Sequence, residues 1–248
     1  FRMLGSSFSI AGPNIVLNSI VSEVLSGFAD VLEKSNNFKT DLAALIKRTY
    51  KEHKRIIFNG NNYSDEWVAE AERRGLLNLK TAVEALPTFV LPKNVEMFKK
   101  HHVFTESEVH SRYEILLENY QKTIHIEALT MIDLVKKEIL PSSLSYQTEL
   151  VTLLHGKKAC GIASEPEETL LIKLSSLTAS LYKKLEELEA AVLCVKTIKD
   201  KLELARYYRF SVFMAMTELR LIADELETMV AKRHWTLPTY AEILYSVN

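Results

Sequence analysis

The feature that most constrains the fold is an apolar residue at every seventh position near the C-terminal end of the chain. This first heptad series runs through Leu174, Leu181, Leu188, Val195 and Leu202, with Leu170, Leu177, Ala191 and Ile198 interleaved. A second heptad series follows at Val212, Met216, Leu219, Ala223, Leu226 and Val230. Such spacing places apolar side chains along one side of a helix, where another helix can cover them. We therefore predict a long antiparallel, coiled-coil-like helical hairpin that reverses near residues 197–201, although Lys184 interrupts the first series and no glycine marks the turn.

Composition favours helices over the whole chain. The 248 residues include only seven glycines and six prolines, which is few for a protein built of hairpins and turns. The hydrophobic share of 47% is ample for a sizeable core. We predict an all-α fold, a helical bundle with the long hairpin as its main element.

Two helices are predicted before Asn59. The first begins at Pro13, because proline suits the first turn of a helix, and runs to about Lys34. Its apolar face consists of Ile15, Val16, Ile20, Val24, Leu25 and Phe28. The apolar positions of the second are Leu42, Leu45, Ile46 and Tyr50. We predict that both faces pack as core, and that a third helix begins after a Ser64 cap and stops at Gly75.

A capping box opens the next helix. Thr105 and Glu108 have the required spacing, and we expect the helix to run on until Pro141 ends it, roughly 50 Å further along. Ser164 and Glu167 repeat the same spacing and predict the start of the hairpin's first arm. A helix of this length is unusual for a small domain standing alone.

Charge excludes a global attraction to nucleic acid or to an anionic membrane, because 31 basic side chains face 32 acidic ones. The densest basic stretch, KRTYKEHKR at residues 47–55, could form a local nucleic-acid patch. We interpret it as a solvated helix face whose apolar residues point inward. With two cysteines and no apolar run of about 18 residues recognised, we expect a soluble protein in the reducing cytoplasm.

Candidate chemical groups are few. His101, His102 and His110, with Glu106 and Glu108 near them, could suggest a metal site, but adjacent histidines on a helix diverge by about 100°. We interpret them as a solvated helix end. The two cysteines show no metal or redox spacing: Cys194 reads as a small core residue and Cys160 as a surface thiol. RYYRF at residues 206–210 could meet a phosphate, although packing is the simpler interpretation.

No phosphate-binding glycine loop and no nucleophile motif was found in the sequence, so the chain by itself is not a complete active site. The opening FRMLGSSFSIAGPN instead alternates apolar residues like the end of a strand, passes through small residues and meets a proline. We interpret it as a short strand-like remnant of a sheet. The chain is therefore expected to be a piece of a larger protein.

Several long stretches carry a resemblance to a known family. They are FRMLGSSFSIAGPNIVLN, IIFNGNNYSDEWVAEAERRGLLNLKTAVEALP, VFTESEVHSRYEILLENYQKTIHIEALTMIDLVKKEILP and WTLPTYAEILYSV. Together they resemble the C-terminal part of a type III glutamine synthetase. The resemblance implies an intact ligase of glutamine biosynthesis and nitrogen metabolism, which joins ammonia to glutamate through γ-glutamyl phosphate, using ATP and magnesium or manganese. It further implies a cytoplasmic, dodecameric ring of identical subunits, with no nucleic-acid or membrane partner.

The resemblance assigns one site residue. Arg2 resembles the active-site arginine that helps to hold glutamate and its phosphorylated form, and the family's metal-binding glutamate would stand just before Phe1. The ATP site and most metal ligands would also precede Phe1, so we expect no catalytic set, bound cofactor or activity in this piece alone. Tyr63 lies near a loop that carries a modifiable tyrosine in type I enzymes, but its surroundings differ and no modification is transferred.

The implied organisation has four parts. They are residues 1–14, the end of the catalytic sheet and a loop; 15–141, the helical part of the catalytic domain; 142–234, the type III hairpin extension; and 235–248, a docking tail. The implied role of this region is structural, in oligomerisation or in regulation. The alternative is a non-enzymatic helical scaffold whose hairpin binds a partner protein.

Overall fold

The computed structural model describes residues 9–245, and every regular element in that range is helical. The all-α prediction is thus confirmed over these residues. Most of the predicted strand-like remnant lies at residues 1–8, outside the described range. Helix α1 begins at Ala11, so the last four residues of the segment predicted as sheet end and loop are helical.

Local geometry explains this early start. The Ala11 N–H donates to the Ser9 hydroxyl at 3.2 Å, and the Asn14 N–H donates to the Ile10 carbonyl at 3.2 Å. Pro13 falls within the first turn, where its missing N–H has no partner to lose. The proline therefore lies inside the first turn and does not mark the first helical residue.

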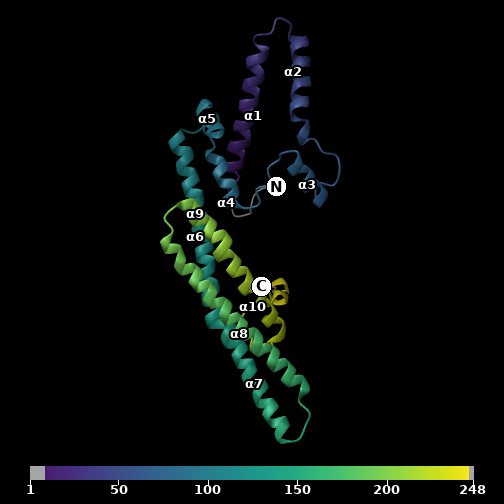
Figure 1. Ribbon diagram of the computed structural model, residues 1–248, viewed down its shortest axis with the longest axis vertical. Helices are drawn as coiled ribbons and strands as arrows, with labels where there is room; N and C mark the ends of the chain where they lie inside the picture. Colours follow the sequence, from purple (N-terminus) through teal and green to yellow (C-terminus); the bar gives the residue numbers. More distant parts are fainter. Residues whose placement is uncertain (1–8, 246–248) are drawn as a thin grey trace. The chain divides into compact units, whose positions relative to one another are not determined.

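The chain divides into two compact units, Phe1–Ile115 and Leu116–Asn248. The helices of the first unit, drawn in purple to teal in Figure 1, are α1 (Ala11–Leu32), α2 (Phe38–His53), α3 (Asp65–Arg73), α4 (Ala82–Ala85), α5 (Pro92–Lys100) and the beginning of α6 (Glu106–Leu134). Short 3₁₀ turns at Lys54–Ile56 and Leu86–Val90 connect them. Helices α1 and α2 form an antiparallel pair (Figure 1), and α1 also contacts α5.

The small core of the first unit surrounds Phe98. This side chain is 1% exposed, and it packs with the buried Val95 and Val109. The Phe98 ring lies 5.5 Å from that of Phe89 and 5.3 Å from that of Phe104. The core therefore lies around α5, the 3₁₀ turn before it and the start of α6.

Three predicted helix boundaries in this unit are confirmed. The Ser64 hydroxyl accepts the Trp67 N–H at 3.4 Å, and Gly75, just after α3, has a φ of +70° that favours glycine. The capping box before α6 is complete. Glu108 accepts the Thr105 N–H at 2.7 Å, and the Thr105 hydroxyl accepts the Glu108 N–H at 3.3 Å.

The second unit holds the remaining helices. They are the rest of α6, α7 (Leu140–Ala159), α8 (Glu165–Cys194), α9 (Lys201–Tyr207), α10 (Phe213–Met229) and α11 (Tyr240–Tyr245), with π-helical turns at Val135–Ile139 and Tyr208–Val212 and a 3₁₀ turn at Val195–Thr197. Helix α8 packs against both α7 and α10. Figure 1 shows α8 and α10 running side by side in opposite directions.

Ion pairs between α8 and α10 define their antiparallel register. Lys173 lies 2.8 Å from Glu225, and Lys184 lies 2.7 Å from Glu218. Residue numbers therefore rise along α8 in the direction in which they fall along α10. Chain reversal falls between Thr197 and α9, within the predicted stretch. The second heptad series is buried at all its positions. That α8 and α10 supercoil as a coiled coil remains a prediction.

The first heptad series is buried at Leu174, Leu181 and Leu188, as predicted, but is only half-buried at Val195 and Leu202, and the interleaved positions differ. The structure buries Thr178, Leu185 and Val192, whereas the predicted Leu170, Leu177 and Ala191 are only half-buried. The buried line therefore lies one residue further along the helix. This shift explains Lys184, which stands beside the buried line and pairs with Glu187 and Glu218 at 2.7 Å each.

The predicted helix end before Pro141 is wrong, because the helix continues. Proline lacks an N–H and its ring crowds the carbonyl four residues back, which normally kinks or ends a helix. Here the turn before it widens into the π-helical Val135–Ile139, and the Leu140 N–H donates to the Val135 carbonyl. Helix α7 then follows without a loop, and Ser142 and Ser143 are buried.

The predicted capping box at Ser164 does not form. The Ser164 hydroxyl donates to the Glu168 carboxylate at 3.0 Å, while Glu167 is paired with Lys157 on α7. Helix α7 continues to Ala159, so residues 160–164 separate it from α8. The carboxylate of Glu167 is thus used to join two helices and not to cap one.

The segment after α10 is anchored by Trp235, whose side chain is 7% exposed, and by Leu237 beside it. The Thr239 N–H donates to Glu242 at 2.8 Å and starts α11. The pairing of Glu242 with Lys232, followed by this backbone bond, lowers the pKa of the Glu242 carboxyl to about 2. The last residues of α11 are exposed, namely Ile243, Leu244 and Tyr245.

Candidate functional site

The one site residue assigned from the sequence, Arg2, lies outside the described residues. Its predicted role in binding glutamate and the phosphorylated intermediate is therefore untested by the geometry. The described part of the chain instead carries polar clusters and exposed apolar surfaces.

The histidine cluster is partly a helix contact. His101 lies beside α5, and its Nε2 is 2.7 Å from the Glu23 carboxylate on α1, which also accepts a hydrogen bond from Lys100 at 3.1 Å. These bonds, that from Lys100 first, lower the pKa of Glu23. Between residues 9 and 245 no group of three His, Cys, Asp or Glu side chains is arranged to hold a metal ion. The donors present therefore do not fit the magnesium or manganese that the resemblance implies.

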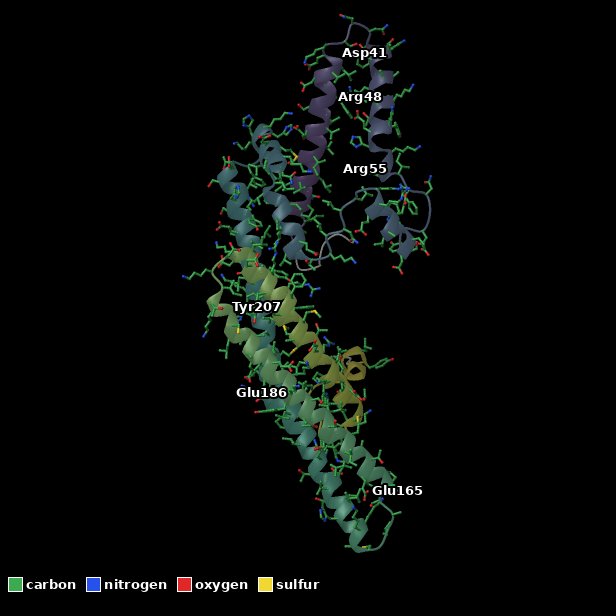
Figure 2. All side chains as sticks on the ribbon, viewed as in Figure 1. Asp41, Arg48, Arg55, Glu165, Glu186 and Tyr207 are labelled. Atoms are coloured by element: carbon green, nitrogen blue, oxygen red, sulfur yellow. The ribbon has the colours of Figure 1, made fainter. Side chains whose placement is uncertain are left out.

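The basic stretch lies on α2 and the turn after it. Figure 2 shows Arg48 on α2 and Arg55 just beyond its end, and the basic side chains of the stretch are exposed, as predicted. Its apolar residues, however, do not point inward. Tyr50 is 66% exposed and Ile46 is 49% exposed, while Leu45 alone is fully buried in α2. The prediction of an inward apolar face is therefore wrong for these two residues.

The tyrosine and arginine side chains before α10 take part in packing. Tyr208 is buried, its hydroxyl lies 3.1 Å from His125 Nδ1, and burial raises its pKa. The Arg209 guanidinium stacks over the Phe213 ring, 4.8 Å from its centroid. Both contacts join this turn to neighbouring side chains of the second unit.

One of the two predictions for the cysteines is wrong. Cys160 is exposed, as expected, but Cys194 is exposed as well, so its prediction as a core residue is wrong. Cys194 is the last residue of α8, and Tyr207, which Figure 2 labels, is the last residue of α9. Burial first, and the Cys194 side chain second, raise the pKa of the Tyr207 hydroxyl.

Half of the apolar face predicted for α1 is exposed, at Ile20, Val24 and Leu25, whereas Ile15, Val16 and Phe28 are half-buried. We define the outer face of α1 by its exposed residues, which are Leu17, Ile20, Val21, Val24, Leu25 and Val31. Their exposed fractions lie between 37% and 58%. Within the described residues α1 is also the one helix apolar enough and long enough to cross a membrane, with a mean hydropathy of 1.6 over 18 residues, contrary to the expectation that no such run exists. This test considers length and composition alone.

An apolar groove of about 610 Å³ lies between α6 and α10 in the second unit. Its apolar lining includes Ile126, Met131, Leu134, Phe213 and Met216, and Arg220 and Asp224 stand among its polar residues. Ile126 is 63% exposed and Phe213 is 39% exposed. The groove could hold apolar side chains from a partner.

Comparison with known proteins decides the family. Residues 41–158 match the glutamine synthetase C-terminal domain. The chain belongs to this family. It is 33% identical to the type-3 glutamine synthetase of Dictyostelium discoideum over 99% of the chain, and 37% identical to a glutamine synthetase of Butyrivibrio fibrisolvens over 86%. A glutamine synthetase of Bacteroides fragilis is 27% identical over 99% of the chain.

The chain is much shorter than these relatives. The matched regions cover 31% of the Butyrivibrio protein and 35% of each of the other two, so the chain spans about a third of their length. The family match runs from α2 almost to the end of α7. The type III resemblance stated from the sequence is thus confirmed.

Two polar contacts of this domain escaped the sequence reasoning. Glu23 joins α1 to the end of α5, and the buried Gln121 side chain donates to the Lys201 carbonyl at 2.6 Å. Neither residue stands in a motif. Only the fold brings the partners together, across 78 and 80 residues of sequence respectively.

Proposed function

We propose that this chain is the C-terminal helical region of a glutamine synthetase, whose intact form condenses glutamate and ammonia with hydrolysis of ATP to ADP and phosphate. The observation that carries the proposal is the 33% identity to a type-3 glutamine synthetase over 99% of the chain. A match of this extent includes the loops as well as the helices. The family match over residues 41–158 supports the same assignment independently.

In this proposal the reacting groups come mainly from the rest of the enzyme. The chain corresponds to about a third of its relatives and matches a domain described as C-terminal. In the intact enzyme, ATP would donate the phosphoryl group of γ-glutamyl phosphate, and a divalent metal would neutralise the phosphate charge. Because the described side chains do not form a metal-binding set, we assign no metal ligand to this chain.

Arg2 is the proposed exception. A guanidinium presents fixed donors that suit the carboxylate of glutamate and the phosphoryl oxygens of the intermediate. In the full enzyme, Arg2→Ala is expected to lower kcat/KM for glutamate strongly, while Arg2→Lys retains the charge and recovers part of it. Unchanged kinetics in Arg2→Ala would remove this residue from the site.

The helices are proposed to support and assemble the enzyme. Residues 15–141 would stabilise the catalytic domain, and the extension at 142–234 would contact neighbouring subunits of a cytoplasmic, dodecameric ring. Residues 235–248 would dock as a tail, consistent with the burial of Trp235. Sedimentation of the full enzyme tests this. Leu221→Glu, on an exposed part of α10, is expected to weaken assembly while leaving the circular dichroism spectrum unchanged.

The central experiment compares two proteins, the longer product of the reading frame and the 248-residue chain. With ATP, magnesium, glutamate and ammonia, we expect glutamine formation by the longer protein and none by the chain alone. Comparable activity in the isolated chain would refute this division of labour.

One observation favours a second candidate, a non-enzymatic helical scaffold. The apolar groove between α6 and α10 would suit an amphipathic helix of a partner protein. The reading frame upstream discriminates between the two. A glutamate codon immediately before Phe1, preceded by a region that encodes a catalytic sheet, supports the enzyme, and its absence supports the scaffold.

A further inference from the structure

The inward side of helix α1 carries both apolar and polar groups, and Ile15 and Val16 on it pack against the Phe98 core. Ser19 is 4% exposed, and its hydroxyl donates to the Ile15 carbonyl at 2.7 Å, which satisfies it within the helix. Glu23, one turn further on, points to the end of α5 and pairs there with Lys100 and His101. The inward side of α1 thus combines apolar packing near the start of the helix with hydrogen-bonded groups further along.

The outer face of α1 is entirely aliphatic. Its members occur at spacings of three and four residues, from Leu17 through Val24 to Val31, which places them on one side of a helix. The two acidic residues of the helix, Glu23 and Asp30, both lie outside this face. A stripe of aliphatic side chains without charge normally faces a protein interior.

The helices that touch α1 leave this face uncovered. Its main partners are α2 and α5, and α2 itself buries fully only Leu45 while exposing Ile46 and Tyr50. Val21 remains 55% exposed and Leu25 remains 58% exposed. The stripe therefore lacks a cover of comparable apolar character among the described helices of its unit.

We propose that the outer face of α1 is the docking surface for the catalytic part of the same polypeptide, the part that precedes residue 1. This inference rests on the proposed function and specifies the surface through which the helical region is attached. The relatives are about three times as long as this chain, and the matched domain is described as C-terminal, so the bulk of the protein lies upstream.

Chain connectivity favours this occupant over others. The matched domain is described as C-terminal, and α1 is the first described helix, so the catalytic part proposed above is joined to the chain on the α1 side. A partner in the same polypeptide has a high effective concentration at this face.

The test uses matched substitutions on two helices. Val21→Glu and Leu25→Glu place a charge on the outer face of α1, and glutamate is as good a helix former as the residues it replaces. Ile172→Glu makes the same kind of change at a 71% exposed position of α8 and serves as the control. Each is introduced into both the 248-residue chain and the longer protein.

In the 248-residue chain we expect all three variants to melt within about 2 °C of the parent, because exposed side chains lose few contacts. In the longer protein we expect Val21→Glu and Leu25→Glu to lower the melting temperature clearly more than Ile172→Glu. Hydrogen–deuterium exchange gives a second readout. Peptides from residues 11–32 should exchange more slowly in the longer parent protein than in the isolated chain.

Other occupants give distinct results, each of which overturns the proposal. A 248-residue chain that sediments as a dimer and becomes monomeric with Val21→Glu indicates a second copy. Flotation with phosphatidylcholine–phosphatidylserine vesicles, lost in Val21→Glu, indicates a bilayer. Equal effects of all three variants in the longer protein, or unchanged exchange in residues 11–32, also reject it.

Failure of the inference is separable from failure of the proposed function. Glutamine formation by the longer parent protein together with unprotected α1 peptides rejects the docking surface alone. Protected α1 peptides in a protein that forms no glutamine reject the enzymatic assignment and retain an intramolecular docking face.

Discussion

Leu181→Ala tests the packing between α8 and α10. The Leu181 side chain is fully buried, and it belongs to the core cluster that the two helices share. Truncating a buried leucine to alanine costs the transfer free energy of the lost methyl groups plus that of the cavity, in total about 2–5 kcal/mol. Alanine favours helix at least as strongly as leucine, so helix propensity does not add to the loss.

A probe confined to the second unit is needed, because the two compact units need not unfold together. The chain has two tryptophans, Trp67 in the first unit and the buried Trp235 in the second. In a Trp67→Phe background, fluorescence reports Trp235 alone. A loss of about 3 kcal/mol at an m value of about 2 kcal/mol/M lowers the urea midpoint by roughly 1.5 M.

The control is Leu193→Ala on the same helix, where the leucine is 64% exposed. The chemical change is identical, but few contacts are lost, so we expect a change below about 0.5 kcal/mol. If Leu193→Ala lowers the urea midpoint as much as Leu181→Ala, the assignment of the buried line along α8 is wrong.

Two further predictions concern polar groups. Thr178→Val removes the hydroxyl that lies 2.6 Å from Ser143 Oγ in a buried contact. It should lower the free energy of unfolding measured in the urea assay by about 1–3 kcal/mol, whereas Thr178→Ser should retain most of the stability. Hydrogen bonds from Arg73 and then Arg74 lower the pKa of Glu70 to about 2, from an ordinary value of 4.5. The stabilisation by Glu70 is therefore complete above pH 4.5 and is lost as the pH falls toward 2. Titration of its carboxyl carbon by NMR should give a midpoint well below 4.5, and a midpoint near 4.5 contradicts the pairing.

The sequence reasoning located the helical hairpin, because heptad spacing depends on local geometry alone. It placed the interleaved line one residue away from the observed one for an identifiable reason. Leu177 is more apolar than Thr178, yet Thr178 is the buried residue, since its hydroxyl bonds to the Leu174 carbonyl and to Ser143. Side-chain partners of this kind do not follow from apolar pattern.

The error at Pro141 has a different origin. A proline raises the local free energy of a helix, and the sequence alone gives no measure of what opposes this cost. In the folded chain, a widened turn before Pro141 relieves the crowding, and Ser143 just after it is buried against Thr178 of α8. Tertiary packing therefore favours one continuous helical path where the local rule predicts two helices.

Helices α1 and α8 show what an apolar pattern can and cannot specify. Both carry a stripe of aliphatic residues at helical spacing, and from each stripe burial was predicted. On α8 the stripe is covered, because the second heptad series on α10 supplies a matching surface within the same unit. On α1 the stripe stays open while Ser19 and Glu23 face inward. The pattern specifies which side chains favour burial, but the residues that cover them can lie far away in sequence. Under the proposed function, this difference between the two helices makes the outer face of α1 the surface at which docking of the catalytic part is best tested.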